Sequence, residues 1–152
     1  MKFMKIILFC SILFAFSFAA EMVIKAELLD MVDNAVTLVE TKGDKALKEI
    51  SKKDGRFVKG SLYVFAYNEK VEIIAHPIKP YLIGKSYKGK PDVKGKKFRD
   101  AIVAKALAGS GWSTYHYQKP NTKGLFLKKT YSRLAVHKGK KYIICAGMYA
   151  GK

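Results

Sequence analysis

The sequence predicts an α+β fold, in which a long N-terminal helix packs on an antiparallel sheet of about five strands with a loop and a helix inserted. Apolar residues recur every three or four positions from Glu21 to Thr41, the period of a helix, and at every second position after Phe57, the period of a strand. Helices followed by a run of strands, rather than alternating with them, are typical of this class. With 152 residues and a 49% hydrophobic share, the chain is large enough for one real core.

Residues 1–19 read as a secretory signal peptide. Two lysines in "MKFMK" precede the apolar run Ile6–Phe18, and small residues at Ser17 and Ala19 fit a cleavage site after Ala19. The alternative is a retained anchor, but a helix of about 13 residues reaches only about 20 Å, against a hydrocarbon core of about 30 Å. We expect a periplasmic or secreted protein whose single domain spans residues 20–152.

Cysteine content and charge exclude several classes of function. Without the leader, Cys145 is the sole cysteine, so no intramolecular disulfide forms, and its apolar neighbours favour a small buried side chain. The formal net charge is +17, almost all from scattered lysines, since only Arg56, Arg99 and Arg133 are arginines. No nucleic-acid motif accompanies this charge. It favours attraction of anionic small molecules or an anionic envelope surface.

The first helix carries a broad apolar stripe through Met22, Ala26, Leu29, Val32, Val36 and Val39. This stripe also suggests a homodimer through the N-terminal helix. Gly43 ends the helix, and Asp44 is expected to cap a short second helix over residues 44–53.

A hairpin follows, made of "SLYVFAYN" and "KVEIIAH". Tyr63, Phe65 and Tyr67 share one face of its first strand, and Leu62, Val64 and Ala66 share the other. Two apolar faces indicate an inner strand. The hairpin closes on His76, which is followed at once by Pro77.

A loop rich in Gly, Pro and Lys over residues 80–97 is longer than a connector needs. We expect a helix over about residues 96–108, which "GSG" terminates. Three strands, "WSTYHYQ", "LFLKKTYSRLAVH" and "KYIICAGMYA", complete the predicted sheet.

Four segments resemble the successive signatures of the single Cache domain, a PAS-like extracytoplasmic sensor fold: "FVKGSLYVFAYNEKVEIIAHPIKPYLIGKSY", "GSGWSTYHYQKP", "KKTYSRL" and "ICAGMY". The resemblance runs from about Ala20 to the end. One departure is the basic "GKPDVKGKKF" after the His-Pro pair, where the family often carries more acidic residues.

The resemblance implies a pocket on the sheet, covered by the loop, that binds a small carboxylate of the acetate, propionate, lactate or pyruvate class. Members are usually the sensing half of chemoreceptors or kinases. Since no kinase core follows the last strand here, we expect a free-standing sensor-type binding protein, with a membrane receptor, a kinase or an envelope protein as partner.

A buried carboxylate must receive several hydrogen bonds, preferably from a cation. On this basis the candidate ligand-binding residues are His76, Lys129, Tyr131, Tyr63, Phe65, Trp112 and Tyr115. Lys129 and Tyr131 alternate onto one face of their strand, and Lys128 takes the place of Lys129 if the register slips by one. For His76 the alternative is a strand terminator, because the following proline lacks an N–H.

Two other classes of function remain open. One is an envelope docking module without a small ligand, and the other an uncharacterised hydrolase. His76, Ser61 and Cys145 belong to no nucleophile motif, and no His or Cys pair has ligand spacing. We therefore expect no catalytic residues, no metal and no cofactor.

Overall fold

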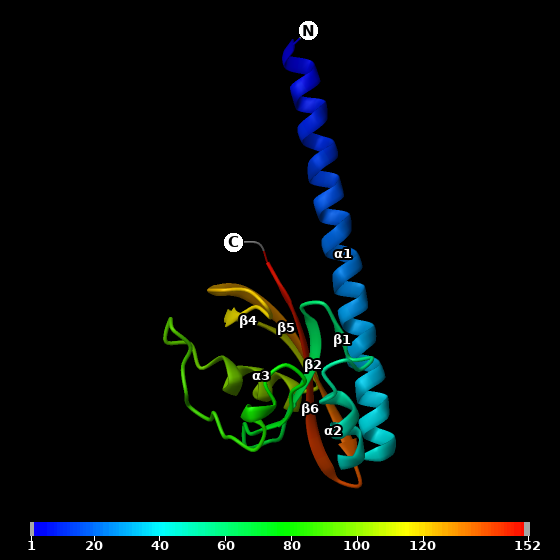
Figure 1. The fold of residues 1–152 in the computed structure, drawn as a ribbon, viewed down its shortest axis with the longest axis vertical. Coiled ribbons are helices and arrows are strands. Elements are labelled where there is room, and N and C mark those ends of the chain that lie inside the picture. Colours follow the sequence, from blue (N-terminus) through cyan, green and yellow to red (C-terminus); the bar gives the residue numbers. More distant parts are fainter. Residues whose placement is uncertain (1, 151–152) are drawn as a thin grey trace.

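The computed structural model describes residues 2–150, with side chains from residue 17 onward. The elements in chain order are α1 (Lys2–Lys42), α2 (Asp44–Ile50), β1 (Val58–Lys59), β2 (Leu62–Tyr67), β3 (Ile73–Ala75), the 3-10 turn η1 (Pro80–Leu82), α3 (Phe98–Leu107), β4 (Ser110–Gln118), β5 (Leu125–His137) and β6 (Lys140–Tyr149). The predicted α+β fold, with a long first helix on an antiparallel sheet, is confirmed (Figure 1).

The sheet has six strands in the order β1-β2-β6-β5-β4, and β3 pairs with β2. The last strand, β6, lies between β2 and β5, so the end of the chain joins the hairpin to the β4–β5 pair. The additional strand beyond the expected five is the two-residue β1, which precedes the hairpin and pairs with the start of β2.

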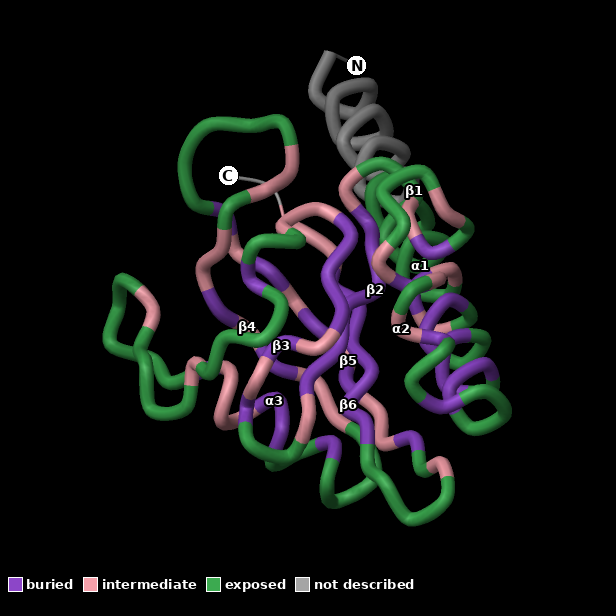
Figure 2. The backbone as a smooth tube through the Cα atoms, turned by 60° about the horizontal axis from the view of Figure 1, so that its bottom comes forward, coloured by how far each residue is buried: buried purple, intermediate pink, exposed green. Residues whose placement is uncertain are grey.

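Helices α1 and α2 cover one face of the sheet (Figures 1 and 2). Leu28, Val32, Ala35 and Val39 of α1 are fully buried against that face. The predicted stripe begins about two turns too early, because Met22 and Ala26 are both exposed and the helix there extends past the packed region. Much of the stripe that suggested a homodimer therefore packs on the sheet, and the homodimer stays a prediction.

The expected leader falls mostly on residues whose side chains lie outside the described set, so it too stays a prediction. In the part of the chain whose side chains are described, no helix is both long and apolar enough to cross a bilayer.

The opposite face of the sheet is covered by α3 and by the segment between β3 and α3. Strand β2 lies between the two layers, and all six of its residues are buried, as expected for an inner strand (Figure 2). Phe98 and Ile102 of α3 pack on the face that carries Tyr63, Phe65 and Tyr67.

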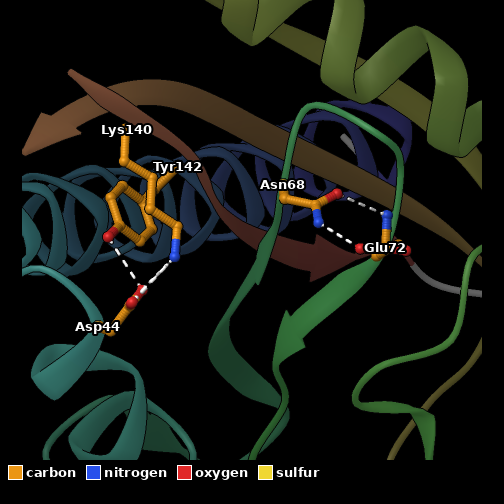
Figure 3. Close-up of polar contacts among 5 residues, drawn as sticks. All are labelled: Asp44, Asn68, Glu72, Lys140 and Tyr142. Atoms are coloured by element: carbon orange, nitrogen blue, oxygen red, sulfur yellow. Dashed lines mark hydrogen bonds and ion pairs between the residues drawn. The ribbon is translucent and has the colours of Figure 1, made fainter.

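The junction of α1 and α2 shows how the helical layer is tied to the sheet. Gly43 ends α1 with a left-handed φ of 57°, a conformation that favours glycine. Asp44 does not cap α2, contrary to expectation, because its carboxylate accepts hydrogen bonds from Lys140 Nζ at 2.7 Å and Tyr142 Oη at 3.0 Å (Figure 3). These bonds lower the pKa of Asp44, Lys140 making the largest contribution.

The β2–β3 turn is fixed by the Asn68 side chain (Figure 3). Its Oδ1 accepts the backbone N–H groups of Lys70 and Glu72, and its Nδ2 donates to the Glu72 carboxylate. These side-chain bonds form an Asx-type turn and add to the backbone bonds from Asn68 N–H to the Glu72 carbonyl and from Val71 N–H to the Asn68 carbonyl. It holds β3, and the residues that follow it, beside β2.

Candidate ligand-binding site

A small cavity lies between the sheet and α3. Its volume is about 10 Å³, room for about one water molecule. The nine residues that line it come from five elements and the end of the hairpin: Tyr63, Phe65, Tyr67, Ile73, His76, Phe98, Tyr115, Tyr117 and Lys128. Aromatic side chains dominate this lining, and polar atoms enter it at few points, which is typical of small-molecule sites.

Lys128 of β5 is the charged residue of the cavity. It is only 1% exposed, and its Nζ donates a hydrogen bond to Tyr63 Oη at 2.9 Å. Ring centroids of Tyr63, Phe65, Tyr149 and Tyr117 lie 4.2, 4.9, 4.9 and 5.4 Å from Nζ, so the ammonium sits among aromatic rings.

Lys128 has no acidic partner in the structure. None of the ion pairs formed by the described side chains includes it, and the lining residues include no aspartate or glutamate. Burial lowers the pKa of Lys128 to about 7, and the nearby Lys79 charge acts in the same direction. The site is thus built around an amine whose positive charge the protein does not neutralise.

Gly147 of β6 makes the room that Lys128 occupies. It pairs with Thr130 across the β5–β6 ladder and lies under the Lys128 side chain. A Cβ at this position would overlap Lys128 Cε and Thr130 Oγ1. The absence of a side chain at Gly147 therefore lets the lysine lie flat across the sheet and reach the cavity.

His76 lies at the end of the hairpin and is 3% exposed. Its ring stacks on Phe65 at a centroid distance of 5.8 Å and tilts over Tyr63 at 5.2 Å. Its Nδ1 accepts the backbone N–H groups of Ile78 at 3.3 Å and Lys79 at 3.1 Å.

These contacts decide the tautomer of His76. An Nδ1 that accepts carries no proton, so the neutral ring holds its proton on Nε2, where it is a donor. Burial, together with the charges of Lys128 and Lys79, lowers the pKa of His76 to about 3, so the ring is neutral near pH 7. His76 both closes the turn after β3 and supplies a neutral donor to the cavity lining.

Phe98 and Tyr115 form the wall of the cavity on the α3 side. Their rings stack in parallel with centroids 3.9 Å apart, and Tyr115 Oη shares a hydrogen bond of 2.9 Å with Thr130 Oγ1. Burial raises the pKa values of Tyr63 and Tyr115 well above the usual range, so both hydroxyls keep their protons. The polar groups of the wall and floor are therefore neutral.

Four of the predicted site residues meet at this cavity: Tyr63, Phe65, His76 and Tyr115. Their convergence follows from alternation, since Tyr63 and Phe65 share a face of β2, which the sequence predicted. The hairpin brings His76 beside them.

The other three lie on the opposite face of the sheet, so the expected juxtaposition of Lys129 with His76 is wrong. Lys129 Nζ pairs with Glu21 of α1 at 3.3 Å, and the Tyr131 ring packs on Trp112 at 5.2 Å. The reason is strand register: neighbours in β5 point to opposite faces, and Lys128 takes the cavity side. The sequence had left this alternative open.

Several lining residues were not among the predicted site residues: Lys128, Phe98, Tyr67, Tyr117 and Ile73. The sequence offered Lys128 only as the alternative to Lys129; its burial beside Thr130 and Ser132 on the same face of β5 is a finding of the structure. Phe98 lies in the helix predicted over about residues 96–108, and nothing local indicates that it closes a cavity.

Cys145 belongs to the same aromatic cluster but does not line the cavity. Cys145 is buried as predicted, and burial raises the pKa of its thiol. Among residues 17–150 no three His, Cys, Asp or Glu side chains gather in a group that could hold a metal ion.

The sequence and the fold both match known proteins. The model of the family described as Single Cache domain 2 matches residues 18–150. The chain belongs to this family. It is a Cache sensor domain, as the four segments of its sequence suggested.

A curated relative of this Cache domain is the sensor histidine kinase MctS of Rhizobium johnstonii (strain DSM 114642 / LMG 32736 / 3841). It is 30% identical over 106 residues, which cover 64% of this chain and 23% of the kinase. The chain thus spans about a quarter of that relative's length.

Three solved structures share the fold of this Cache domain. A periplasmic sensor domain of a chemotaxis protein is 24% identical, with a TM-score of 0.72 over 88% of this chain and 98% of that one. A Cache chemosensory domain that recognises carboxylic acids is 22% identical, with a TM-score of 0.70 over 88% and 97%. A methyl-accepting chemotaxis protein of Vibrio parahaemolyticus RIMD 2210633 is also 22% identical, with a TM-score of 0.70 over 86% and 91%.

Proposed function

We propose that this Cache domain binds a small carboxylate, of the acetate, propionate, lactate or pyruvate class, in the cavity beside Lys128. The observation that carries this proposal is a buried lysine without an acidic partner. A charged group removed from water is costly unless an opposite charge compensates it. A carboxylate in the cavity is the missing opposite charge.

The other lining groups suit a carboxylate as well. An oxygen 4 Å from the Lys128 ammonium gains about 4 kcal/mol at an effective dielectric constant of about 20. The His76 Nε2–H and the Tyr63 hydroxyl are neutral donors beside the same ammonium. The aromatic rings of Phe65 and Phe98 fit the alkyl part of the ligand.

The volume of the cavity limits the size of the ligand. Space for about one water molecule is less than any of these acids needs, so Phe98 or its neighbours must move outward when an acid enters. The smallest acids require the least movement, and we expect acetate to bind better than acids of four carbons. At a ceiling of about 1.5 kcal/mol per heavy atom, acetate gains at most about 6 kcal/mol, so its Kd is expected to be in the tens of micromolar or weaker.

The relatives support a role in signalling. One of the structural neighbours recognises carboxylic acids, and the others belong to chemotaxis proteins. We propose that the domain reports an acid outside the cytoplasm, in the periplasm or after secretion, to a receptor, a kinase or an envelope protein. In this scheme the domain binds its ligand without converting it.

The test is a thermal-shift screen of the purified protein with monocarboxylic acids of one to four carbons, followed by calorimetry on the best of them. We expect acetate or propionate at millimolar concentration to raise the melting temperature. A screen in which no acid shifts the melting temperature and none gives a binding isotherm would overturn the proposal. Turnover of an acid or an ester would indicate a hydrolase, and capture of an envelope protein without any acid would indicate a docking module.

A further inference from the structure

We propose that Lys128 takes up a proton when the acid binds, so that the cavity accepts a carboxylate together with one proton and responds to pH as well as to the acid. This inference rests on the proposed function. It follows from the surroundings of Lys128, which enclose the amine among aromatic rings, give it the Tyr63 hydroxyl as a neutral hydrogen-bond partner and provide no negative charge.

The groups that face Lys128 from β2 and β4 stay neutral near pH 7. Tyr63 accepts the hydrogen bond from Nζ, and burial raises the pKa of its hydroxyl. Tyr117 and Tyr115 of β4 also line the cavity, and burial raises their pKa values as well. None of these phenols becomes a counter-ion for the lysine.

The remaining neighbours come from β6 and from the segment after β3. Tyr149 presents its ring to Nζ, and Cys145 lies beneath the cavity; burial raises the pKa of both. His76 is neutral, and its pKa is about 3. Lys79 lies outside the cavity lining and is partly exposed; burial and the Arg99 charge lower its pKa as well, and its own charge lowers the pKa of Lys128. Lys128 is thus the one group of the described lining whose charge changes between pH 6 and 9.

The sign of the effect follows from linkage. In the empty cavity the pKa of Lys128 is about 7, and a bound carboxylate raises it towards its usual value near 10.4. Below pH 7 the ammonium is already present, so binding needs no proton and the affinity is constant. Above pH 7 each pH unit lowers the affinity about tenfold, because the amine must first be protonated. Below about pH 5 the acid itself becomes protonated and the affinity falls again.

The experiment is calorimetry of acetate binding to the full chain from pH 6 to pH 9. At pH 8 the titration is repeated in HEPES and in Tris, whose different ionisation enthalpies reveal proton exchange. We expect uptake of about 0.9 proton at pH 8 and about 0.1 at pH 6, with an affinity that drops about tenfold between pH 8 and 9. An affinity that is constant from pH 6 to 9, or identical binding enthalpies in the two buffers, overturns the inference and leaves the proposed function intact.

Two controls assign the proton to the protein and to this residue. Methanesulfonate carries a charge that does not titrate, and it should lose affinity above pH 7 as acetate does. Lys128→Arg, which keeps its charge at every pH, should bind acetate with a flat profile if its melting curve shows a folded protein.

A direct measurement covers the case in which no acid binds or Lys128→Arg fails to fold. In the wild-type protein, the NMR signal of the Lys128 side chain, assigned with Lys128→Met, should titrate near pH 7. A Lys128 that titrates above pH 10 in the empty protein overturns the inference. If no acid binds at any pH, the proposed function fails and this inference fails with it.

Discussion

The two faces of the sheet are built from different kinds of residues. The face against α1 and α2 has an aliphatic centre, where Val64, Ala66, Ile144 and Ala146 of the sheet pack on the helices, and it also carries Trp112, Tyr131 and Tyr142. The face against α3 is aromatic and contains a buried lysine and a buried histidine. One face is a dry core that holds the fold together, while the other leaves a small cavity with an uncompensated charge. The fold and the site thus use opposite sides of the same strands.

Lys128 and Lys129 show this difference at adjacent positions. Lys128 is buried with no acidic partner, whereas Lys129 is half exposed and pairs with Glu21. An exposed pair of this kind contributes about 0 to 1 kcal/mol. The same residue type is a functional candidate on one face and a surface lysine on the other.

The largest expected effect is a comparison of Lys128→Met with Lys129→Met. Lys128→Met should reduce acetate affinity at least 100-fold, because it removes the cation of the cavity. It should also raise the free energy of unfolding of the empty protein at pH 6 by about 1 to 3 kcal/mol, since a buried charge is replaced by an apolar chain of similar size. Calorimetry and urea unfolding measure the two effects. Lys129→Met should change neither by more than a small amount, and an equal loss of binding in both variants would contradict the assignment of the two faces.

His76→Ala tests the second polar group of the cavity. The ring is also part of the turn, because Nδ1 accepts the N–H groups of Ile78 and Lys79. Losing these acceptors should cost about 1 to 3 kcal/mol of stability, and losing the Nε2 donor should weaken acetate binding about tenfold. Affinity is compared at a temperature where the variant is folded. Unchanged affinity per folded molecule would make His76 a structural residue only.

Gly147→Ala tests the packing that positions Lys128. The new methyl group would overlap Lys128 Cε and Thr130 Oγ1, so we expect an affinity loss of about tenfold and a stability loss of about 1 to 3 kcal/mol. Gly111→Ala on β4 is the matched control, because its Cβ would crowd the Cβ and the stem of Lys105, a residue that does not line the cavity, so it should cost stability without loss of affinity. If Gly147→Ala binds acetate like the wild type, the position of Lys128 does not depend on this glycine.

The smallest expected effect is on the helical face. Asp44→Asn removes the charge that accepts hydrogen bonds from Lys140 and Tyr142 (Figure 3). The Asp44 and Lys140 side chains are largely exposed, although the Tyr142 ring is buried, so the loss should be at most about 1 kcal/mol. Because the pKa of Asp44 is lowered, the wild type should lose this contribution only when the pH falls below about 4. Acetate affinity should not change, and a change would show that the two faces are coupled.

The sequence predicted the fold better than the site, and the residues show why. Hydrophobic period located α1, β2 and α3, because burial on one face or two faces leaves a pattern in the chain. The two-residue period of a strand correctly placed Lys129 and Tyr131 on the same face of β5. The hydrophobic period did not tell which face of β5 meets α3. Phe126 and Leu127 are neighbours that point to opposite faces, and both are apolar, so neither face is marked as the buried one. That choice depends on the pairing of β5 with β6 and on the space above Gly147, and both are set by residues distant in the sequence.

The position of β2 has a consequence for how this domain tolerates sequence change. Every residue from Leu62 to Tyr67 contacts a packed layer, so none of its six positions faces solvent. In a library that contains every single substitution in this segment, few variants should stay folded, whether the change is at an odd or an even position. In strand β5, positions that tolerate substitution should instead alternate with positions that do not, since burial alternates along the strand through Thr130 and Ser132. During evolution, the less buried positions of β5 can therefore change freely, whereas the sequence of β2 changes little.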